Sequence, residues 1–357
     1  MTYCCELFDR QVASDLQQKL DRYITENEIP GVILYVVTPD GEWEGASGVA
    51  NLATRTPMTT RHLVRIATVT QLFVAVIALQ LIENEELSLE DTIADWLPDE
   101  ICDRLPNCDE IAIRNLLQHT SGLADYEDNE VFEGAIEIST SNYVWTAKEA
   151  ITYAYDLEAA FEPEEYREYS NTNYVLLELI IEAVTGNSLA QEFTSRISKV
   201  LDLKATFFEG KETLKGELAN GYSNLNNDNV PAETSNSNNA YGLADCGLIS
   251  NIYDVAALLE GLFINEELLG IESLEAMTDW YETSDGSCYG LGIDRWESDW
   301  GELWSQDGSV GGFYSTVWYL PEEGISMICF ENHSDNSDPD EMLKSVLSLL
   351  LGKFEED

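Results

Sequence analysis

The chain has 357 residues, and its hydrophobic content of 44% is enough to bury a large core in one compact unit of two lobes. Its 18 basic and 67 acidic residues give a formal net charge of −49, which makes nucleic acid and anionic membrane surfaces poor partners. No segment approaches the roughly 20 uninterrupted apolar residues that a membrane-spanning helix needs, so we expect no membrane partner.

The acidic residues are spread along the chain and are not gathered in one tail. Their mutual repulsion opposes the compact state unless salt or bound cations screen it. We therefore expect a protein adapted to high salt, with an acidic but otherwise ordinary protein as the alternative.

The first residues and the cysteines bear on the cellular location. Residues 1–10 have neither a basic start nor an apolar centre, so they do not form a signal peptide. The seven cysteines are scattered, with no CxxC pair and no Cys/His cluster at metal-ligand spacing. We expect a cytoplasmic protein with neither a metal site nor a cofactor. Cys102 and Cys108 flank a short loop, where a disulfide is possible but not implied.

The first predicted elements are a helix, a hairpin and a buried helix. Apolar residues at helical spacing predict a helix over 11–28. A β-branched run at 31–38 and a Pro-Asp-Gly turn before 42–51 predict a β-hairpin. Apolar positions recur at helical spacing after Thr68 and predict a buried helix over 68–84.

The middle of the chain, 111–220, is mostly helical in pattern, including segments 114–118, 146–157 and 172–185. The segment 224–239 is rich in Asn, Asp and Ser and is predicted to be a long loop.

The end of the chain returns to strands. Residues 315–320 and 325–331, joined by a turn, predict a second hairpin, and 339–352 predicts a final helix. Strand pairs at both ends with helices between them predict an α/β (α+β) fold, with an antiparallel sheet from both termini and an inserted helical lobe. We expect one domain over 1–357, with a sheet lobe at about 11–60 and 240–357 and a helical lobe at about 61–239.

Four motifs occur in a characteristic order. They are Arg65–Gln71 before the long apolar run, Ile113–Leu123, Tyr169–Tyr174, and Gln306–Gly308 shortly before Gly311. Together they resemble the nucleophile helix, the helix-and-loop signature, the Tyr-x-Asn motif and the His-x-Gly or Lys-x-Gly motif of one superfamily. This is the superfamily of serine β-lactamases, penicillin-binding proteins and D-peptidase esterases, and the resemblance is to its class C β-lactamase-like members.

The resemblance implies a five-stranded antiparallel sheet covered by helices, a second helical lobe and a cleft between them. In such a cleft a hydroxyl at a helix N-terminus lies in a positive dipole, and a Lys one turn later faces the same side. The Lys and a Tyr help to take the hydroxyl proton, and an Asn orients the substrate amide. Backbone N–H groups form the oxyanion hole.

The sequence departs from this pattern where the ionisable groups belong. Thr68 stands at the Ser position with a stiffer, secondary hydroxyl, and Gln71 stands at the Lys position without a titratable amine. Gln306 removes the cationic or imidazole group of the third motif. Tyr169 and Asn171 remain where the family would have them. General-base assistance contributes typically about 10²- to 10⁴-fold, so its loss predicts slow hydrolysis at best.

Three functional hypotheses follow. The first is a repurposed, non-hydrolytic cleft for a small molecule, in which Tyr169 donates or accepts a proton and Gln71, Asn171, Gln306 and Gly308 position a neutral polar ligand. The second is a catalytically silent binding protein. The third is a weak esterase, peptidase or β-lactam hydrolase, with Thr68 as nucleophile and Tyr169, its pKa lowered, as base.

Several of these residues also have structural interpretations. For Thr68 we favour an ordinary helix N-cap over a nucleophile, because no base is near it in sequence. His119 is interpreted as a structural member of its loop. Trp296, Trp300 and Trp304 are spaced at four residues and either line a ligand pocket or pack in the core or in a hairpin, which is the commoner explanation.

Overall fold

The computed structural model describes residues 8–139, 143–224, 231–235, 242–283, 286–335 and 338–352. A nine-stranded antiparallel sheet, in the order β3-β2-β1-β14-β13-β12-β11-β10-β9, forms its central layer. Its strands are β1 Gly31–Thr38, β2 Gly41–Asn51, β3 Thr56–Pro57, β9 Tyr281–Glu282, β10 Cys288–Tyr289, β11 Asp294–Ser298, β12 Gly301–Val310, β13 Phe313–Leu320 and β14 Ile325–Glu331.

The two ends of the chain meet in this sheet. Strand β1 pairs with β14, with Val32 opposite Glu331 and Val37 opposite Ser326. Both predicted hairpins, β1–β2 and β13–β14, are confirmed, and so is the sheet built from both ends. The sheet is wider than the five strands implied by the resemblance. Four strands are added, β3, β9, β10 and β11. Of these, β3, β9 and β10 contain two residues each, too few to show an alternating pattern in sequence, and β11 contains five.

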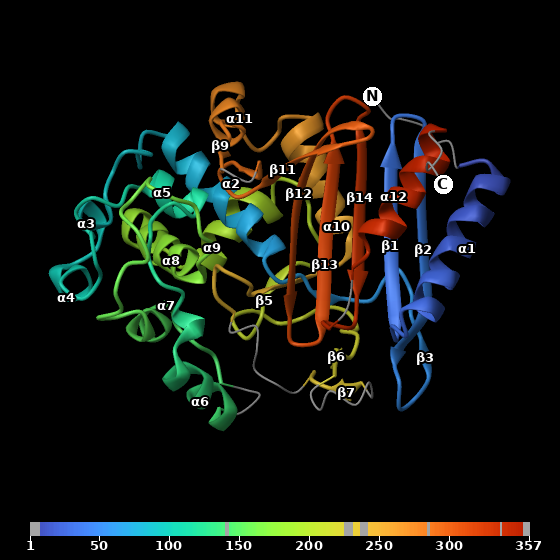
Figure 1. Ribbon diagram of the computed structural model, residues 1–357, viewed down its shortest axis with the longest axis horizontal. Coiled ribbons are helices and arrows are strands. Elements are labelled where there is room, and N and C mark those ends of the chain that lie inside the picture. Colours follow the sequence, from blue (N-terminus) through green and yellow to red (C-terminus); the bar gives the residue numbers. More distant parts are fainter. Residues whose placement is uncertain are drawn as a thin grey trace.

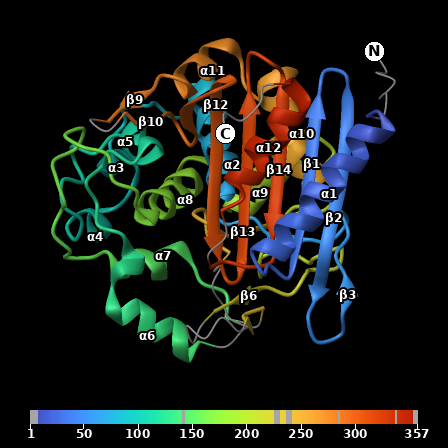
Figure 2. The ribbon, with the colours of Figure 1, turned by 45° about the vertical axis from the view of Figure 1, so that its right-hand side comes forward.

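Helices α1 Arg10–Glu26 and α12 Asp340–Leu351 cover one face of the sheet, as Figure 2 shows. Strand alternation divides β1 between the two faces. Val32 and Leu34 pack with the α1 and α12 side chains, whereas Ile33 joins the core on the opposite face. Each apolar side chain fully buried in this way contributes about 1.5–3 kcal/mol.

Helix α2, Val69–Glu83, lies in the core on the opposite face, and all but three of its fifteen side chains are buried. It confirms the predicted buried helix. Helix α10, Ile252–Leu259, packs behind β14 and β1 on this same face, and most of the other helical elements gather beside α2 and beyond the β9 side of the sheet (Figure 1). These other elements are α3 Ile93–Trp96, α4 Asp99–Cys102, α5 Ile113–Gln118, η1 Tyr126–Asp128, α6 Glu130–Ile138, α7 Ala147–Ala150, η2 Ile151–Tyr153, α8 Asn171–Thr185, α9 Leu189–Phe193, η3 Thr194–Ser198, η4 Glu260–Ile264 and α11 Ile271–Met277.

Two of the three predicted helical segments in the middle of the chain are confirmed, and the third is only partly helical. Helix α5 confirms 114–118 and α8 confirms 172–185. The prediction for 146–157 is wrong beyond its first half, because α7 passes into the short 3-10 turn η2 and the chain then reverses at Asp156, whose φ is 60°.

Two small sheets lie outside the main one. Strands β4 Val64–Arg65, β8 Leu248–Ser250 and β5 Phe207–Phe208 form the first. Strands β6 Tyr222–Ser223 and β7 Ala232–Glu233 form the second. The predicted loop 224–239 lies largely outside the described residues, and its described part contains β7.

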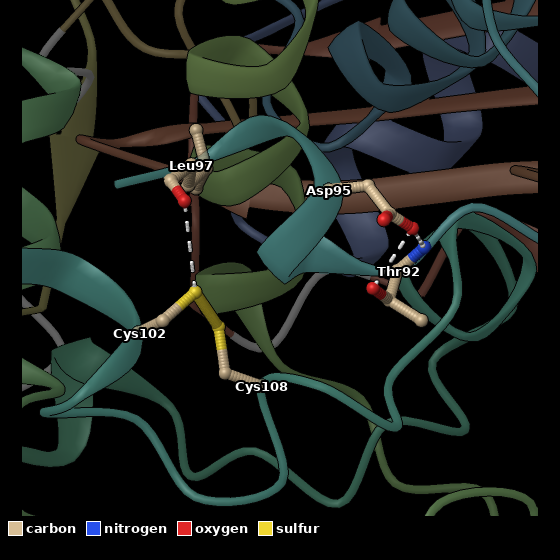
Figure 3. Close-up of a disulfide and its surroundings, with 5 residues drawn as sticks. All are labelled: Thr92, Asp95, Leu97, Cys102 and Cys108. Carbon is tan, nitrogen blue, oxygen red and sulfur yellow. Dashed lines mark hydrogen bonds between the residues drawn. A yellow bond between two sulfur atoms is a disulfide. The ribbon is translucent and has the colours of Figure 1, made fainter. Parts of the chain in front are cut away.

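A disulfide joins Cys102, at the end of α4, to Cys108 (Figure 3). Disulfides are rare in reducing cytoplasm, so this pair speaks against the cytoplasmic location, which stays a prediction. Over the described ranges, no helix is long and apolar enough to cross a membrane.

Candidate functional site

The predicted site residues converge at the start of α2. Thr68 directly precedes α2, Tyr169 and Asn171 come from the start of α8, and Gln306 and Gly308 come from β12. The chain enters α2 through Ala67, whose φ of 48° is uncommon for a residue with a side chain. Such a conformation is often found at functional sites, because surrounding contacts must hold it in place.

The Thr68 hydroxyl donates a hydrogen bond to the main-chain oxygen of Asp307 on β12. The Gln306 amide donates in return to the Thr68 carbonyl at 3.2 Å. The favoured interpretation of Thr68 as a side-chain cap is therefore wrong. Thr68 occupies the N-cap position, but its φ and ψ of −67° and −9° are already helical and its side chain makes no capping bond.

Gly308 allows β12 to approach α2 this closely. A Cβ atom on Gly308 would lie 1.8 Å from the Thr68 hydroxyl oxygen and 3.0 Å from the Thr68 main-chain nitrogen. A glycine is needed here for close packing of two backbones. Gly308 thus gives the site its spacing, whether or not it also touches a ligand.

A directed chain of hydrogen bonds links the remaining site residues. His119 lies 3.2 Å from the Gln71 side-chain oxygen, and the Gln71 amide donates to the Tyr169 hydroxyl at 2.7 Å. Tyr169 in turn donates to the Asn171 side-chain oxygen at 2.6 Å. The Asn171 amide donates to Asp125 at 3.0 Å. Every polar atom along this path has a fixed role as donor or acceptor, so the side chains hold one another in place.

His119 orients Gln71. It is fully buried, it ends α5 with a φ of 58°, and its Nδ1 atom faces the Ser170 N–H and the Asn173 amide. With Nδ1 accepting, the ring proton resides on Nε2 and is donated to Gln71. Burial and the nearby Arg167 lower the pKa of His119 to about 3, so the ring stays neutral. This agrees with a structural role for His119, which also orients Gln71 in the site.

Tyr169 is fixed as a neutral phenol. Burial of its ring, together with Asp245, raises the pKa of Tyr169 well above 10. The weak-hydrolase hypothesis needs a base from elsewhere in the fold, and the raised pKa of Tyr169 disfavours this residue as that base. Tyr169 still exposes 38% of its surface, so a ligand can reach it.

Carboxyl groups missed in the sequence lie beside Tyr169 and Asn171. We call Asp125, Glu127 and Asp245 the acidic triad. Tyr126 donates to Asp245 at 2.6 Å, and one ligand atom each from Glu127, Asp245 and Cys246 lies within 4.8 Å of the others. Burial and the neighbouring carboxyls raise the pKa of the fully buried Asp245 to about 7. The pKa of Glu127 is also raised, by desolvation and by Asp245 and Asp125, but its side chain is exposed to solvent, which weakens this effect. Such a group is stabilised by protons or by a neighbouring cation.

One sequence signal pointed toward part of the triad. Residues 246–250 resemble a strand of the family that passes near the site, and Asp245 directly precedes them. Asp125 and Glu127 lie in a loop and a 3-10 turn without any pattern, and only the fold brings them there.

The neighbouring cations are engaged with other partners. Arg65 forms an ion pair with Glu209 at 2.8 Å, and Arg167 lies over the Tyr289 ring and 3.6 Å from Asp294. In the part of the chain that the structure describes, no Lys or Arg hydrogen-bonds to Thr68, Gln71 or Tyr169. The site is thus built from hydroxyl and amide groups with carboxyl groups at one side.

Comparison with known proteins places this arrangement in a family. The Beta-lactamase family matches residues 16–350, and the chain belongs to that family. The family accounts for the antiparallel sheet with flanking helices.

Several relatives are similar along most of the chain. A D-aminopeptidase of Brucella anthropi is 27% identical over 338 residues, which cover 93% of this chain and 61% of that protein. Penicillin-binding protein 4 of Amycolatopsis lactamdurans is 23% identical over 87% of this chain and 82% of its own length.

The similar solved structures include two amidohydrolases. A D-stereospecific amidohydrolase from Streptomyces sp. has a TM-score of 0.84 at 26% identity, covering 96% of this chain and 99% of its own. D-amino acid amidase from Ochrobactrum anthropi SV3, complexed with L-phenylalanine amide, has the same TM-score, identity and coverage.

Proposed function

We propose that the site binds a small, amine-bearing polar ligand and does not form an acyl-enzyme. The observation that carries this proposal is the Gln71 amide, held between His119 at 3.2 Å and Tyr169 at 2.7 Å. An amide fixed in a neutral hydrogen-bond chain takes up no proton from a nucleophile.

The absence of a base near the hydroxyl supports a non-acylating site. The Thr68 hydroxyl donates its proton to a main-chain carbonyl, and the pKa of Tyr169 is raised by burial. A hydroxyl nucleophile needs an adjacent base, and without one the rate falls by about 10²- to 10⁴-fold. Tyr169 then serves as a hydrogen-bonding group, with Gln71 and Asn171 holding its orientation and Gln306 and Gly308 bordering the ligand.

The acidic triad supports an amine on the ligand. An ammonium group near Glu127 and Asp245 replaces the protons that these carboxyls otherwise retain at neutral pH. The solved relative bound to L-phenylalanine amide suggests the probe, since that compound carries both an amine and an amide.

Calorimetric titration with D- and L-phenylalanine amide tests binding, and N-acetyl-phenylalanine amide, which lacks the basic amine, is the control. We expect saturable binding of at least one enantiomer and none of the acetylated compound. Tyr169→Phe and Glu127→Gln should each weaken binding about tenfold, in line with lost hydrogen bonds to charged groups, and Thr68→Ala should leave it intact. Loss of binding in Thr68→Ala but not in Tyr169→Phe would contradict the proposal.

Acylation is tested separately by intact-protein mass spectrometry after incubation with a β-lactam and activated esters in molar salt. We expect no adduct on the native chain and a slow adduct on the double variant Thr68→Ser, Gln71→Lys. An adduct mapped to Thr68 in the native chain would support the alternative, a weak hydrolase of the esterase, peptidase or β-lactamase kind. Absence of both ligand binding and acylation would favour a catalytically silent scaffold.

A further inference from the structure

A recess of about 500 Å³ lies on the face of β11–β13 opposite Thr68, near the start of α12. We call it the tryptophan recess and define it by Trp296, Trp300, Tyr314, Trp318, Asp307 and Asp340. Strand alternation separates it from the Thr68 site, because Gln306 faces Thr68 while the neighbouring Asp307 side chain faces the recess. We propose that this recess binds a quaternary alkylammonium ion that carries an oxygen acceptor.

The aromatic rings provide the first argument. Three of the eight tryptophans of the chain line this one recess, together with Tyr314. Trp300 and Trp318 are buried and pack into the core under α12. The accessible rings are therefore those of Trp296 and the half-buried Tyr314, and Lys344 also lines the recess. Trp296 exposes 49% of its surface and is held in orientation by its indole N–H, which donates to Ser305 at 3.0 Å. Aromatic faces around a cavity of this size attract quaternary ammonium ions.

The carboxyl groups provide the second argument. Asp307 accepts a hydrogen bond from Tyr314 at 3.0 Å, and burial raises its pKa. Burial, with repulsion from Asp338, Asp307 and Glu341, raises the pKa of Asp340 to about 6 against the opposing effect of Lys344. An organic cation between the rings relieves this repulsion without needing a hydrogen bond from every carboxyl oxygen.

A buried indole N–H without a hydrogen-bond partner provides the third argument, and it is the reason why the proposed ligand carries an oxygen acceptor. Trp300 exposes only 7% of its surface, and its indole nitrogen has no acceptor among the described residues. A buried N–H without a partner costs about 1–3 kcal/mol, which a ligand oxygen would recover. Choline, with a hydroxyl group, and glycine betaine, with a carboxylate, both combine a quaternary ammonium group with such an oxygen.

Tryptophan fluorescence and calorimetry with choline and glycine betaine test the proposal in the full chain. Two further compounds serve as controls. Tetramethylammonium has the quaternary ammonium charge but no oxygen acceptor, and 3,3-dimethylbutanol is the uncharged isostere of choline. We expect saturable binding of choline or betaine and about tenfold weaker binding of the isostere. Equal binding of the isostere, or no saturation by either cation, would overturn the proposal.

Variants identify the recess as the binding site. Trp296→Ala, at a half-exposed position, and Asp340→Asn should each weaken binding about tenfold, whereas Glu272→Gln, at an exposed first-turn carboxyl of α11, should not change it. Trp300→Phe keeps a ring but removes the N–H. It should weaken choline or betaine and leave tetramethylammonium unchanged. Unchanged binding in both Trp296→Ala and Asp340→Asn would overturn the assignment to this recess. Preference for betaine indicates a carboxylate partner, and preference for choline a hydroxyl partner.

Discussion

The hydroxyl of Thr68 and the main-chain oxygen of Asp307 are joined by a hydrogen bond across the start of α2 and strand β12. The same two elements are joined a second time by the Gln306 amide, 3.2 Å from the Thr68 carbonyl. The Thr68 hydroxyl thus links the start of the helix to the sheet. Its proton is directed to an acceptor that cannot remove it.

Gly308→Ala should destabilise the protein. The added Cβ would lie 1.8 Å from the Thr68 hydroxyl oxygen, so β12 must move away from α2. Overpacking of this kind costs about 1–3 kcal/mol in the free energy of unfolding. Denaturant titration of the variant and of the native chain measures the difference.

A double-mutant cycle identifies the contact responsible. Thr68→Ala removes the hydroxyl that the new Cβ meets, so the double variant should be more stable than the sum of the single changes predicts. Strict additivity of the two effects would mean that the clash with the Thr68 hydroxyl is not the cause, since the Thr68 Cβ, 2.9 Å from the added atom, remains in the double variant.

The positions of the site residues were predictable because the family motifs keep their order along the chain. Thr68, Gln71, Tyr169, Asn171 and Gln306 meet as expected, and the helices α2 and α8 follow the helical apolar spacing from which they were predicted. What these residues do there was harder to predict. The hydrogen bond from Thr68 to Asp307 joins residues 239 positions apart. The residues around Thr68 and around Asp307 show no sequence pattern from which this bond could be predicted.

The tryptophans show a second limit of sequence reasoning. Spacing at four residues suggested one common environment for Trp296, Trp300 and Trp304. The hairpin β11–β12 instead places Trp296 and Trp300 at the recess, while Trp304 packs against Phe263 and Tyr319 on the opposite face. The hairpin turn lies between Trp296 and Trp304 and reverses the direction of the chain. A regular spacing in sequence therefore does not place side chains on one face across this turn.

His119 should remain a neutral imidazole with its proton on Nε2 from pH 8 down to pH 5. Its pKa is lowered to about 3 by burial and by Arg167, and both neighbours of Nδ1 are donors. Nitrogen NMR of the imidazoles measures tautomer and charge directly, and the chain has only three histidines. The variant His119→Gln assigns the signal. A His119 signal that titrates near pH 6.5 would contradict the buried, Gln71-directed geometry.

The acidic triad should make stability fall as pH rises from about 5 to 8. Burial raises the pKa of Asp245 to about 7, and the pKa of Glu127 is raised as well, so in this range the folded state binds more protons than the unfolded state. The free energy of unfolding therefore decreases with pH, and the stability present at pH 5 is lost as the two carboxyls ionise.

Glu127→Gln isolates this contribution from the general charge of the surface. The variant should show a shallower decline in melting temperature between pH 5 and 8 than the native chain. Glu272→Gln, an exposed carboxyl in α11, serves as the control and should keep the native slope. Parallel slopes for all three proteins would mean that Glu127 titrates as an ordinary surface acid.

The melting temperature should rise with salt well beyond the concentrations that screen charges. The net charge is −49, and only eleven ion pairs join the basic groups to acids in the described ranges. Screening is nearly complete by about 0.5–1 M, so a further rise toward 3 M of KCl indicates that cations bind the acidic surface. Calorimetric scans from low to molar KCl measure the effect. Repeating them near the isoelectric point of about 4.1, where the net charge vanishes, should reduce it sharply. A melting temperature at neutral pH that is flat from low to molar salt would refute adaptation to high salt.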